Sequence, residues 1–233
     1  VIPAGYAFDF VGRDMLLKDL QMKDGRLTAI SGTSYKLLVL PAKPARISLQ
    51  LAQRLRELVT QGLVLIGPRP LGAAGLSATD EQVNAVTAEL WGDLDGAQKT
   101  SRAVGKGRVY WGLTLDQVLA AEKLAPDMSF TADKLVSIHR SLKDGEIYFI
   151  ANQNASAVQA EASLRVTGRE AELWHADDAR IEAAAYRESE GRTIVPLSLA
   201  PYEAVFVVLR KPAKQKSRAV SVKTETKLAT VEG

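Results

Sequence analysis

The chain has 233 residues, of which 46% are hydrophobic and 24% charged, and its formal net charge is +3. Single domains most often have about 100–150 residues, so this length predicts two folded domains. The charge is uneven, because residues 210–233 hold seven Lys and Arg against two acids and residues 1–209 therefore carry a net −2. A nucleic-acid-binding protein needs a basic face on its folded part, and this distribution argues against one.

The chain contains no cysteine. This excludes disulfides, thiolate metal ligands and cysteine nucleophiles. No stretch of about 20 apolar residues could cross a membrane. The start, Val1-Ile-Pro3, has neither an initiator Met nor the basic residues that open a signal peptide. We therefore expect the chain to be part of a longer polypeptide.

The start of the chain predicts a strand, a short helix and a hairpin. Residues 6–11 alternate apolar and polar side chains, as a half-buried strand does. Asp14 can cap a helix that runs to Leu20, and Lys23-Asp-Gly25 is typical of a hairpin turn. Residues 35–40 are nearly all apolar and predict a buried strand of the parallel type.

Helices with marked ends then alternate with further strands. The segment Ser48–Gln61 carries its apolar residues on one face, and Gly62 follows it where a positive φ is expected. Capping boxes at Thr79 and Thr114 predict the starts of two more helices. The intervening strands are predicted at residues 63–66 and 107–112. Strand–helix alternation of this kind predicts a small doubly wound parallel sheet.

The second half reads as a series of short strands separated by Gly, Asp and Asn turns, which predicts an antiparallel β-sandwich. The predicted strands are residues 136–140, 147–152, 162–166, 171–174, 180–186, 193–199 and 204–209. The predicted organisation is thus α/β plus all-β. Residues 1–125 form the α/β domain, residues 126–210 the β-sandwich, and residues 211–233 a basic linker expected to be extended.

Candidate ligand-binding residues are few in the first domain. The carboxyl ends of its predicted parallel strands, where ligands bind in such sheets, carry Arg13, Lys43 and Arg69. Either Lys43 or Arg69 could contact an anion, although loop cations are usually solvated. No glycine-rich phosphate-binding motif follows a strand, so we expect no nucleotide cofactor. An amidotransferase reaction is excluded because its nucleophile would be a cysteine.

The second half contains both histidines, His139 and His175. A metal site or a Ser-His-Asp arrangement could be built on His175 with Asp177 or Asp178. The two aspartates are better explained by the turn before Arg180. His139 lies within an alternating strand and has a structural explanation of the same kind.

Paired carboxylates would be needed by a glycosidase, which places two of them about 5–10 Å apart. The pairs Glu170/Glu172 and Glu188/Glu190 have strand spacing and so share a face, but such pairs usually face solvent. The three tryptophans could stack on sugar rings. Trp91 lies on an apolar helix face and is expected in the core, whereas the sequence does not say whether Trp111 is buried or exposed. The remaining aromatic candidates for stacking on a sugar are Trp174, Tyr186 and Tyr202.

Short segments spread over residues 5–210 form a series with a fixed order and spacing. They are Gly5-Tyr-Ala-Phe-Asp-Phe-Val11, Asp24-Gly25-Arg26, Tyr35-Lys-Leu-Leu-Val-Leu-Pro41, Leu58-Val-x-x-Gly62, Gly67-Pro-Arg-Pro70, Leu90-Trp-Gly92, Gly105-Lys-Gly107, Ile138-His-Arg140, Ile147-Tyr-Phe-Ile-Ala-Asn-Gln153, Leu164-Arg-Val166 with Gly168, Glu172-Leu-Trp174 and Leu199-Ala-Pro-Tyr-Glu-Ala-Val-Phe-Val207. Together they resemble a region of the α-L-rhamnosidases of glycoside hydrolase family 106. The segment Trp174-His-Ala-Asp177 departs from the commoner Trp-Asp-Pro pattern, with little consequence for a turn.

The resemblance implies a location behind the catalytic (β/α) barrel, with an amidotransferase-like α/β domain followed by a β-sandwich. The family's catalytic carboxylates and calcium site would lie on the barrel, so no catalytic, metal-binding or cofactor-binding residue is carried over to this segment. Leu228-Ala-Thr-Val-Glu-Gly233 is similar to the lead-in to a further sugar-binding β domain. The implied partners are this domain, the barrel and rhamnose-containing glycans, in a secreted or periplasmic bacterial protein.

Three hypotheses follow. The chain is a non-catalytic ancillary region of an α-L-rhamnosidase-like glycoside hydrolase that supports or shapes its barrel. Alternatively, it is a carbohydrate-binding module that uses exposed aromatic residues of the sandwich. The third hypothesis is an independent enzyme built on His175 with Asp177 or Asp178.

Overall fold

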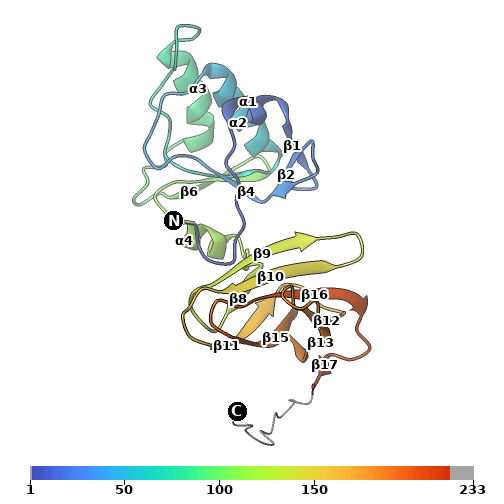
Figure 1. Ribbon diagram of the computed structural model, residues 1–233. Coiled ribbons are helices and arrows are strands. Elements are labelled where there is room, and N and C mark those ends of the chain that lie inside the picture. The colour runs from blue at the N-terminus through green and yellow to red at the C-terminus, as the bar shows by residue number, and fades with distance from the viewer. Residues whose placement is uncertain (1, 221–233) are drawn as a thin grey trace, which may run out of the picture. The chain divides into compact units, whose positions relative to one another are not determined.

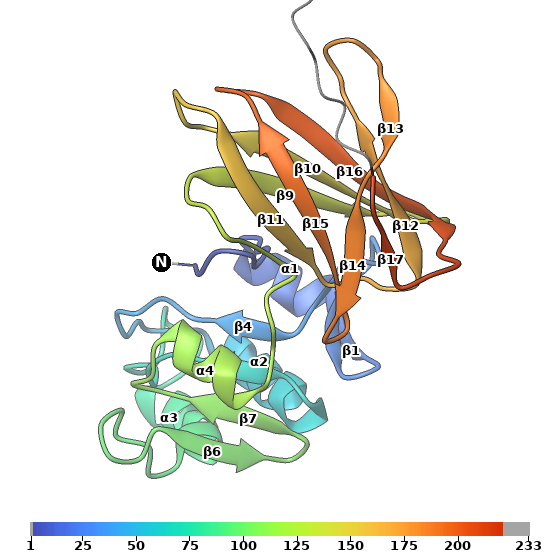
Figure 2. The same cartoon turned by 90° about the horizontal axis from the view of Figure 1, so that it is seen from below.

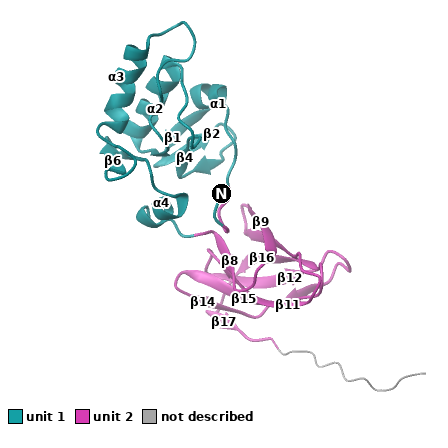
Figure 3. Ribbon diagram, turned by 90° about the vertical axis from the view of Figure 1, so that its left-hand side faces the viewer, with its two compact units in different colours: residues 1–3, 8–125 teal, residues 4–7, 126–233 magenta. Residues whose placement is uncertain are grey.

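The structure, a computed structural model, describes residues 2–220 and consists of two compact units (Figure 3). Unit 1 comprises residues 1–3 and 8–125, and unit 2 comprises residues 4–7 and 126–233. The chain therefore passes between the units near its start and again between Ala125 and Pro126.

Unit 1 has two sheets and four helices among its described residues (Figure 1). In chain order its elements are α1 (Arg13–Lys18), β1 (Leu20–Lys23), β2 (Arg26–Ala29), β3 (Ser34–Tyr35), β4 (Leu37–Val39), α2 (Leu49–Gln61), β5 (Val64–Ile66), α3 (Asp80–Trp91), β6 (Ser101–Val104), β7 (Gly107–Tyr110) and α4 (Leu115–Ala121). One sheet has the order β1-β2-β3 and the other β4-β5-β7-β6. Strand β5 pairs in parallel with β4 and with β7, as the sequence predicts, whereas β6 is antiparallel to β7.

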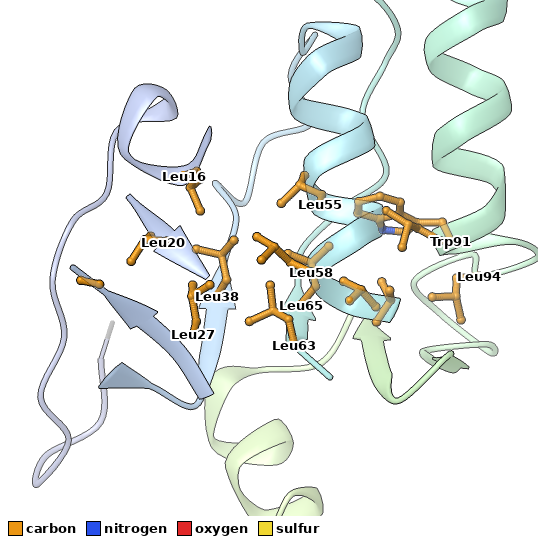
Figure 4. Close-up of a cluster of buried hydrophobic side chains, with 14 residues drawn as sticks. Leu16, Leu20, Leu27, Leu38, Leu55, Leu58, Leu63, Leu65, Trp91 and Leu94 are labelled. Carbon is orange, nitrogen blue, oxygen red and sulfur yellow. The ribbon is translucent and has the colours of Figure 1, made fainter. Parts of the chain in front are cut away.

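Helices cover both faces of the sheet that contains β5. Leu65 and Val109 point from one face into a large apolar cluster with residues of α2 and α3 (Figure 4). Ile66 and Tyr110 point from the other face toward Val118 of α4, and Figure 2 shows α4 on the opposite side of this sheet from α2. Strands that are buried on both faces need the nearly continuous apolar runs seen in the sequence.

The helix starts and turns read from the sequence are mostly confirmed. Ser48 caps α2 by accepting a hydrogen bond from the Leu51 backbone, and Gly62 ends this helix with φ 129°. Complete capping boxes at Thr79 and Thr114 begin α3 and α4. The turn between β1 and β2 places Asp24 and Gly25 at positive φ, as a two-residue type I′ hairpin requires.

The start of unit 1 differs from the sequence prediction. Residues 6–11 form no strand, and Phe10 is 93% exposed. An alternating pattern makes a strand only where a partner strand supplies hydrogen bonds, and the described structure places none beside this segment. Helix α1 begins after Gly12, which has no side chain that could cap the helix. Asp14 lies within the first turn and is therefore not the capping residue.

Unit 2 consists of two antiparallel sheets. Its strands are β8 (Met128–Phe130), β9 (Leu135–Ser141), β10 (Glu146–Asn152), β11 (Val158–Leu164), β12 (Arg169–Trp174), β13 (Ile181–Ala183), β14 (Tyr186–Ser189), β15 (Arg192–Leu199), β16 (Ala204–Pro212) and β17 (Ser217–Arg218). The sheet orders are β13-β12-β16-β10-β9 and β17-β14-β15-β11-β8. Both sheets contribute to one buried cluster, which contains Tyr148 and Val207 from the first and Leu164 and Val195 from the second. The predicted all-β, antiparallel character is confirmed.

Two details of unit 2 correct the sequence prediction. Residues 180–186 are not one strand, because β13 pairs with β12 while β14 pairs with β15 in the other sheet. The chain changes sheets at Ala184 and Ala185, which lie between the two strands. Residues 211–220 also differ from the expected linker: β16 continues to Pro212, and β17 pairs with β14. The remainder of that segment, residues 221–233, lies outside the described residues.

Arg218 fastens β17 to the body of unit 2. Its guanidinium donates to the backbone oxygens of Ala171 and Ala184, pairs with Glu170 at 3.1 Å and lies over the ring of Tyr186. Backbone acceptors and a carboxylate together use most of the guanidinium donors. The basic residues after β16 are therefore partly structural, which a count of charges does not reveal.

Trp91 gives a test of the core of unit 1. Its side chain is fully buried, and its Nε1 donates to Gly67 O at 3.0 Å. Trp91→Ala removes this packing and leaves the carbonyl without its partner, so the free energy of unfolding of unit 1 should fall by about 3–5 kcal/mol. Urea unfolding followed by circular dichroism measures the change. Ile30→Ala, at a side chain that is 79% exposed, is the control and should change it by less than about 0.5 kcal/mol.

Candidate functional site

The carboxyl ends of the parallel strands offer no nucleophile. The residues that directly follow β4, β5 and β7 are Leu40, Gly67 and Trp111. Gly67 has φ 144°, and a Cβ atom there would lie 2.7 Å from Cβ of Leu40, so no side chain fits at this turn. Arg69 donates to Thr87 Oγ1 at 3.3 Å and to the backbone oxygen of Asn84. These hydrogen bonds hold the Arg69 side chain against α3. Lys43, the other candidate for binding an anion, is an exposed cation in a loop.

A pocket of about 780 Å³ lies instead at the amino ends of these strands in unit 1. Its charged lining residues are Lys36, Lys106, Arg108 and Glu122. Glu122 accepts a hydrogen bond from Tyr110 Oη at 2.7 Å and lies 3.8 Å from Arg108. Burial and the neighbouring Glu122 raise the pKa of Tyr110 to about 12, so the phenol stays protonated. A glycosidase needs two carboxyl groups on either side of the bond, and Glu122 is the one carboxylate among the described lining residues of this pocket.

His175 is buried but is not part of a catalytic triad. Its Nε2 lies 3.1 Å from Oε1 of Glu182, and its Nδ1 lies 3.7 Å from Oε1 of Glu203. Asp178 accepts from the backbone and side chain of Arg180, which confirms its role in the turn between β12 and β13. The enzyme hypothesis that joined His175 to Asp177 or Asp178 is therefore not supported by the geometry.

The first carboxylate pair suggested by strand spacing, Glu170 and Glu172, is bound to cations. Glu170 pairs with Arg218, and Glu172 pairs with Lys211 at 2.5 Å and accepts from Trp174 Nε1 at 3.2 Å. Lys211 holds the pKa of Glu172 below its usual value, so this carboxyl is ionised and unsuited to donating a proton.

The second pair lines a hollow of about 270 Å³ beside the turn between β14 and β15. Glu188 accepts a hydrogen bond from the backbone N–H of Gly168. Glu190 lies at the exposed tip of the turn with φ 51°. Glu188 thus binds a backbone N–H and Glu190 is exposed, so neither carboxylate has the apolar surroundings of a general acid.

No metal site is formed in the part of the chain that the structure describes, since no three His, Asp or Glu residues there are arranged to bind an ion. Within residues 2–220, no helix is long and apolar enough to cross a membrane. His139 is bound between Asp127 and Glu146 at the edge strand β9.

The three aromatic candidates for sugar stacking have different surroundings. Tyr186 is buried, and its Oη donates to the backbone oxygen of Gln215 at 3.0 Å. Tyr202 is 70% exposed in the loop before β16. Trp174 is half-buried at the end of β12. From the sequence alone we also expect Trp174 to be mostly buried, and the half-buried ring meets this expectation only in part, because it lies on the outer face of its sheet.

Trp174 belongs to a row of large apolar side chains that crosses this outer face. Strand register pairs Trp174 with Ile181 of β13 and with Phe206 of β16, Phe206 with Phe149 of β10, and Phe149 with Ile138 of β9. Residues directly opposite each other in antiparallel strands point to the same face. We call Ile181, Trp174, Phe206, Phe149 and Ile138 the outer row.

The outer row faces away from the core. Tyr148 and Val207, which alternate with Phe149 and Phe206 along their strands, point into the buried cluster. At the two ends of the row, Ile138 is 55% and Ile181 58% exposed. Neighbouring strands lie about 4.8 Å apart, so five residues extend over about 19 Å.

A sheet face of this kind usually carries polar residues when it meets only water. Large apolar patches that are exposed on a protein surface often mark interaction sites. Sequence reasoning missed Phe149, Phe206 and Ile138, although alternation within Ile147-Tyr-Phe-Ile150 placed Phe149 opposite to Tyr148. The missing information was the register that aligns five separate strands.

Comparisons with known proteins connect this architecture to a family. The model of the glycoside hydrolase 106 family, described as α-L-rhamnosidase, matches residues 1–188. The chain belongs to this family. The rhamnosidase from Novosphingobium sp. PP1Y has a structure that matches all of this chain with a TM-score of 0.91 and 34% sequence identity. The family expectation drawn from the short sequence segments is thereby confirmed.

A curated relative from Formosa agariphila, named "Putative beta-glucuronidase", is 30% identical over 229 residues, or 95% of this chain. The chain spans 22% of the Novosphingobium rhamnosidase and 18% of the Formosa protein. The family relationship thus covers a segment about one fifth as long as either relative.

The outer row can be tested by placing charges at its two ends. Ile138 and Ile181 lie on β9 and β13, the edge strands of the sheet, where lysine is well tolerated. Ile138→Lys combined with Ile181→Lys should therefore change the free energy of unfolding of unit 2 by less than about 1 kcal/mol. The same variant should bind less of a hydrophobic fluorescent dye, because the apolar patch is interrupted.

Ile30→Lys, in unit 1, is the matched control and should leave dye binding by unit 2 unchanged. Unaltered dye fluorescence in the double variant would show that the outer row is not an accessible patch. Unfolding of unit 2 would instead show that these two isoleucines are part of its core.

Proposed function

We propose that this chain is a non-catalytic ancillary region of an α-L-rhamnosidase-like glycoside hydrolase. Its role is to support or shape the catalytic barrel of a longer polypeptide. The observation that carries this proposal is the outer row, an apolar surface that extends over five strands of unit 2. The candidate carboxylates of the same unit are bound to cations or backbone groups or are exposed at a turn. A catalytic centre needs an acid and a base across one bond, whereas an ancillary unit needs a surface for its neighbour.

The finer architecture belongs to the same proposal. Unit 1 corresponds to the amidotransferase-like α/β domain expected after the barrel, with Gly67 at the turn where an amidotransferase would hold its nucleophile. Unit 2 corresponds to the β-sandwich that follows. The proposed partners are the barrel and a further β domain of the same polypeptide. The proposed substrate of that longer protein is a rhamnose-containing glycan.

A carbohydrate-binding module is the second candidate, and the rings of Trp174, Phe206 and Phe149 are the observation that favours it. Sugar recognition combines stacking with hydrogen bonds from adjacent polar groups. Near Trp174, however, the indole N–H already donates to Glu172, and Glu172 also accepts a hydrogen bond from Lys211. The aliphatic ends of the row, Ile138 and Ile181, also fit a protein surface better than a sugar ring. These contacts support the ancillary role over the binding module.

The first test is hydrolysis. The purified 233-residue chain should release no nitrophenol from 4-nitrophenyl α-L-rhamnoside above the rate in buffer, because its described carboxylates form no acid–base pair. A rhamnosidase that contains a catalytic barrel serves as the positive control under the same conditions. Absorbance at pH values from 5 to 8 measures the release.

Turnover that disappears in His175→Ala or Glu172→Ala would overturn the non-catalytic assignment and restore the enzyme hypothesis. Turnover that is unchanged in both variants would place the reaction elsewhere in the chain and would equally contradict the proposal. A chain without turnover that binds a rhamnose-containing oligosaccharide, and loses this binding in Trp174→Ala, would favour the binding module.

A further inference from the structure

His139 is held between two carboxylates on the inner side of β9. Its Nδ1 lies 2.7 Å from Oδ2 of Asp127, and its Nε2 lies 2.8 Å from Oε2 of Glu146. A neutral imidazole carries a hydrogen on one nitrogen only, so it can donate to one ionised carboxylate. The protonated ring donates to both. The geometry around His139 therefore selects the charged form.

The surroundings reinforce this selection. The ring stacks on Tyr148 with 4.0 Å between centroids and 8° between planes. The side chains of His139, Asp127 and Glu146 are only 23%, 19% and 25% exposed, which limits screening by water. Tyr148 Oη is buried and makes no hydrogen bond within the described structure, so it does not compete for either carboxylate.

The other polar and charged groups near the cluster come from two further segments and from β9 itself. Arg165, after β11, lies 3.3 Å from Oδ1 of Asp127. Arg192 of β15 donates to the backbone oxygen of Asp127 at 3.2 Å. Ser141 at the end of β9 donates to the second oxygen of Glu146, and Arg140 on the same strand reaches the backbone oxygen of His139. One imidazolium and one guanidinium thus meet two carboxylates.

These groups couple stability to pH. Burial lowers the pKa of His139, but the hydrogen bonds and charges of Asp127 and Glu146 outweigh it and raise the pKa above its usual value. Burial raises the pKa of Asp127, and His139 and Arg165 outweigh it and lower that pKa. The contribution of His139 is therefore present below its unfolded pKa of about 6.5 and is lost as pH rises through the raised folded pKa. The contribution of Asp127 is lost only as pH falls through its lowered pKa.

Asp127 also fixes both passages of the chain into unit 2. Its backbone N–H donates to Gly5 O at 2.8 Å, and its backbone oxygen accepts from the N–H of Arg165 at 2.9 Å. Gly5 has φ 81°, and a Cβ atom there would lie 2.0 Å from the backbone oxygen of Met128. The segment 4–7 thus lies directly against the chain that follows Pro126. A loss of the side-chain bond of Asp127 would loosen both segments together.

We propose that Asp127, His139 and Glu146 form a pH-operated latch. Protonated His139 fastens Asp127, and with it Gly5, to strands β9 and β10. When His139 loses its proton as the pH rises, one of the two hydrogen bonds is lost and the segments at residues 4–7 and 126–128 open more often. The latch would hold these two segments of unit 2 together more firmly when His139 is protonated than when it is neutral.

Two measurements on the intact chain test the latch. Because the chain has only two histidines, nuclear magnetic resonance of the imidazole nitrogens can follow each one during a pH titration. His139 should titrate at a higher pH in the folded chain than in urea. Hydrogen exchange, corrected for the intrinsic pH dependence, should show that protection of the Asp127 amide falls about threefold or more between pH 6 and pH 9.

Variants separate the latch from a general effect of pH. His139→Gln should abolish the pH-dependent change in protection, and His175→Gln, the matched control, should retain it. If His139→Gln does not fold, Glu146→Gln provides the second test, because removing one carboxylate should move the titration of His139 and the loss of protection to lower pH. Equal protection of Asp127 at both pH values in the unaltered chain, or an unchanged profile in Glu146→Gln, would overturn the proposal.

Discussion

The pairing of β10 with β16 is the interaction on which the rest of unit 2 depends. These two central strands match Tyr148 with Val207 and Phe149 with Phe206. Because side chains alternate along a strand, this one register sends the first pair into the core and the second pair to the outer face. A shift by one residue would exchange the two sets. The buried cluster and the outer row are therefore two consequences of the same alignment.

The same alternation accounts for the two histidines. His139 is opposite Tyr148 in register, and His175 follows Trp174 by one position, so both lie on the inner side of the sheet near its opposite edges. At an edge the core is thin, and a polar ring there needs partners. The partners of His139 are the carboxylates of Asp127 and Glu146, and those of His175 are the carboxylates of Glu182 and Glu203. Four carboxylates of unit 2 thus position imidazole rings, and none of them belongs to the pairs that strand spacing suggested.

Much of the fold could be predicted from local signals. Capping at Thr79 and Thr114, the glycine after α2 and the alternation of the later strands depend on residues close in sequence. What failed depends on distant partners: residues 6–11 alternate without a strand beside them, residues 180–186 divide between two sheets, and Arg218 makes its bonds 34 to 48 positions away. The outer row was missed for the same reason, since its five members come from five strands.

The most direct test of the ancillary role is to compare the outer row in this chain and in a longer family 106 polypeptide that contains it. Hydroxyl-radical footprinting with mass spectrometry reports how accessible Trp174, Phe149 and Phe206 are to solvent. If this face docks on another domain, their oxidation should be several-fold slower in the longer polypeptide, and that of Tyr202 should report any general shielding of unit 2. Equal oxidation of the outer row in both proteins would contradict the account.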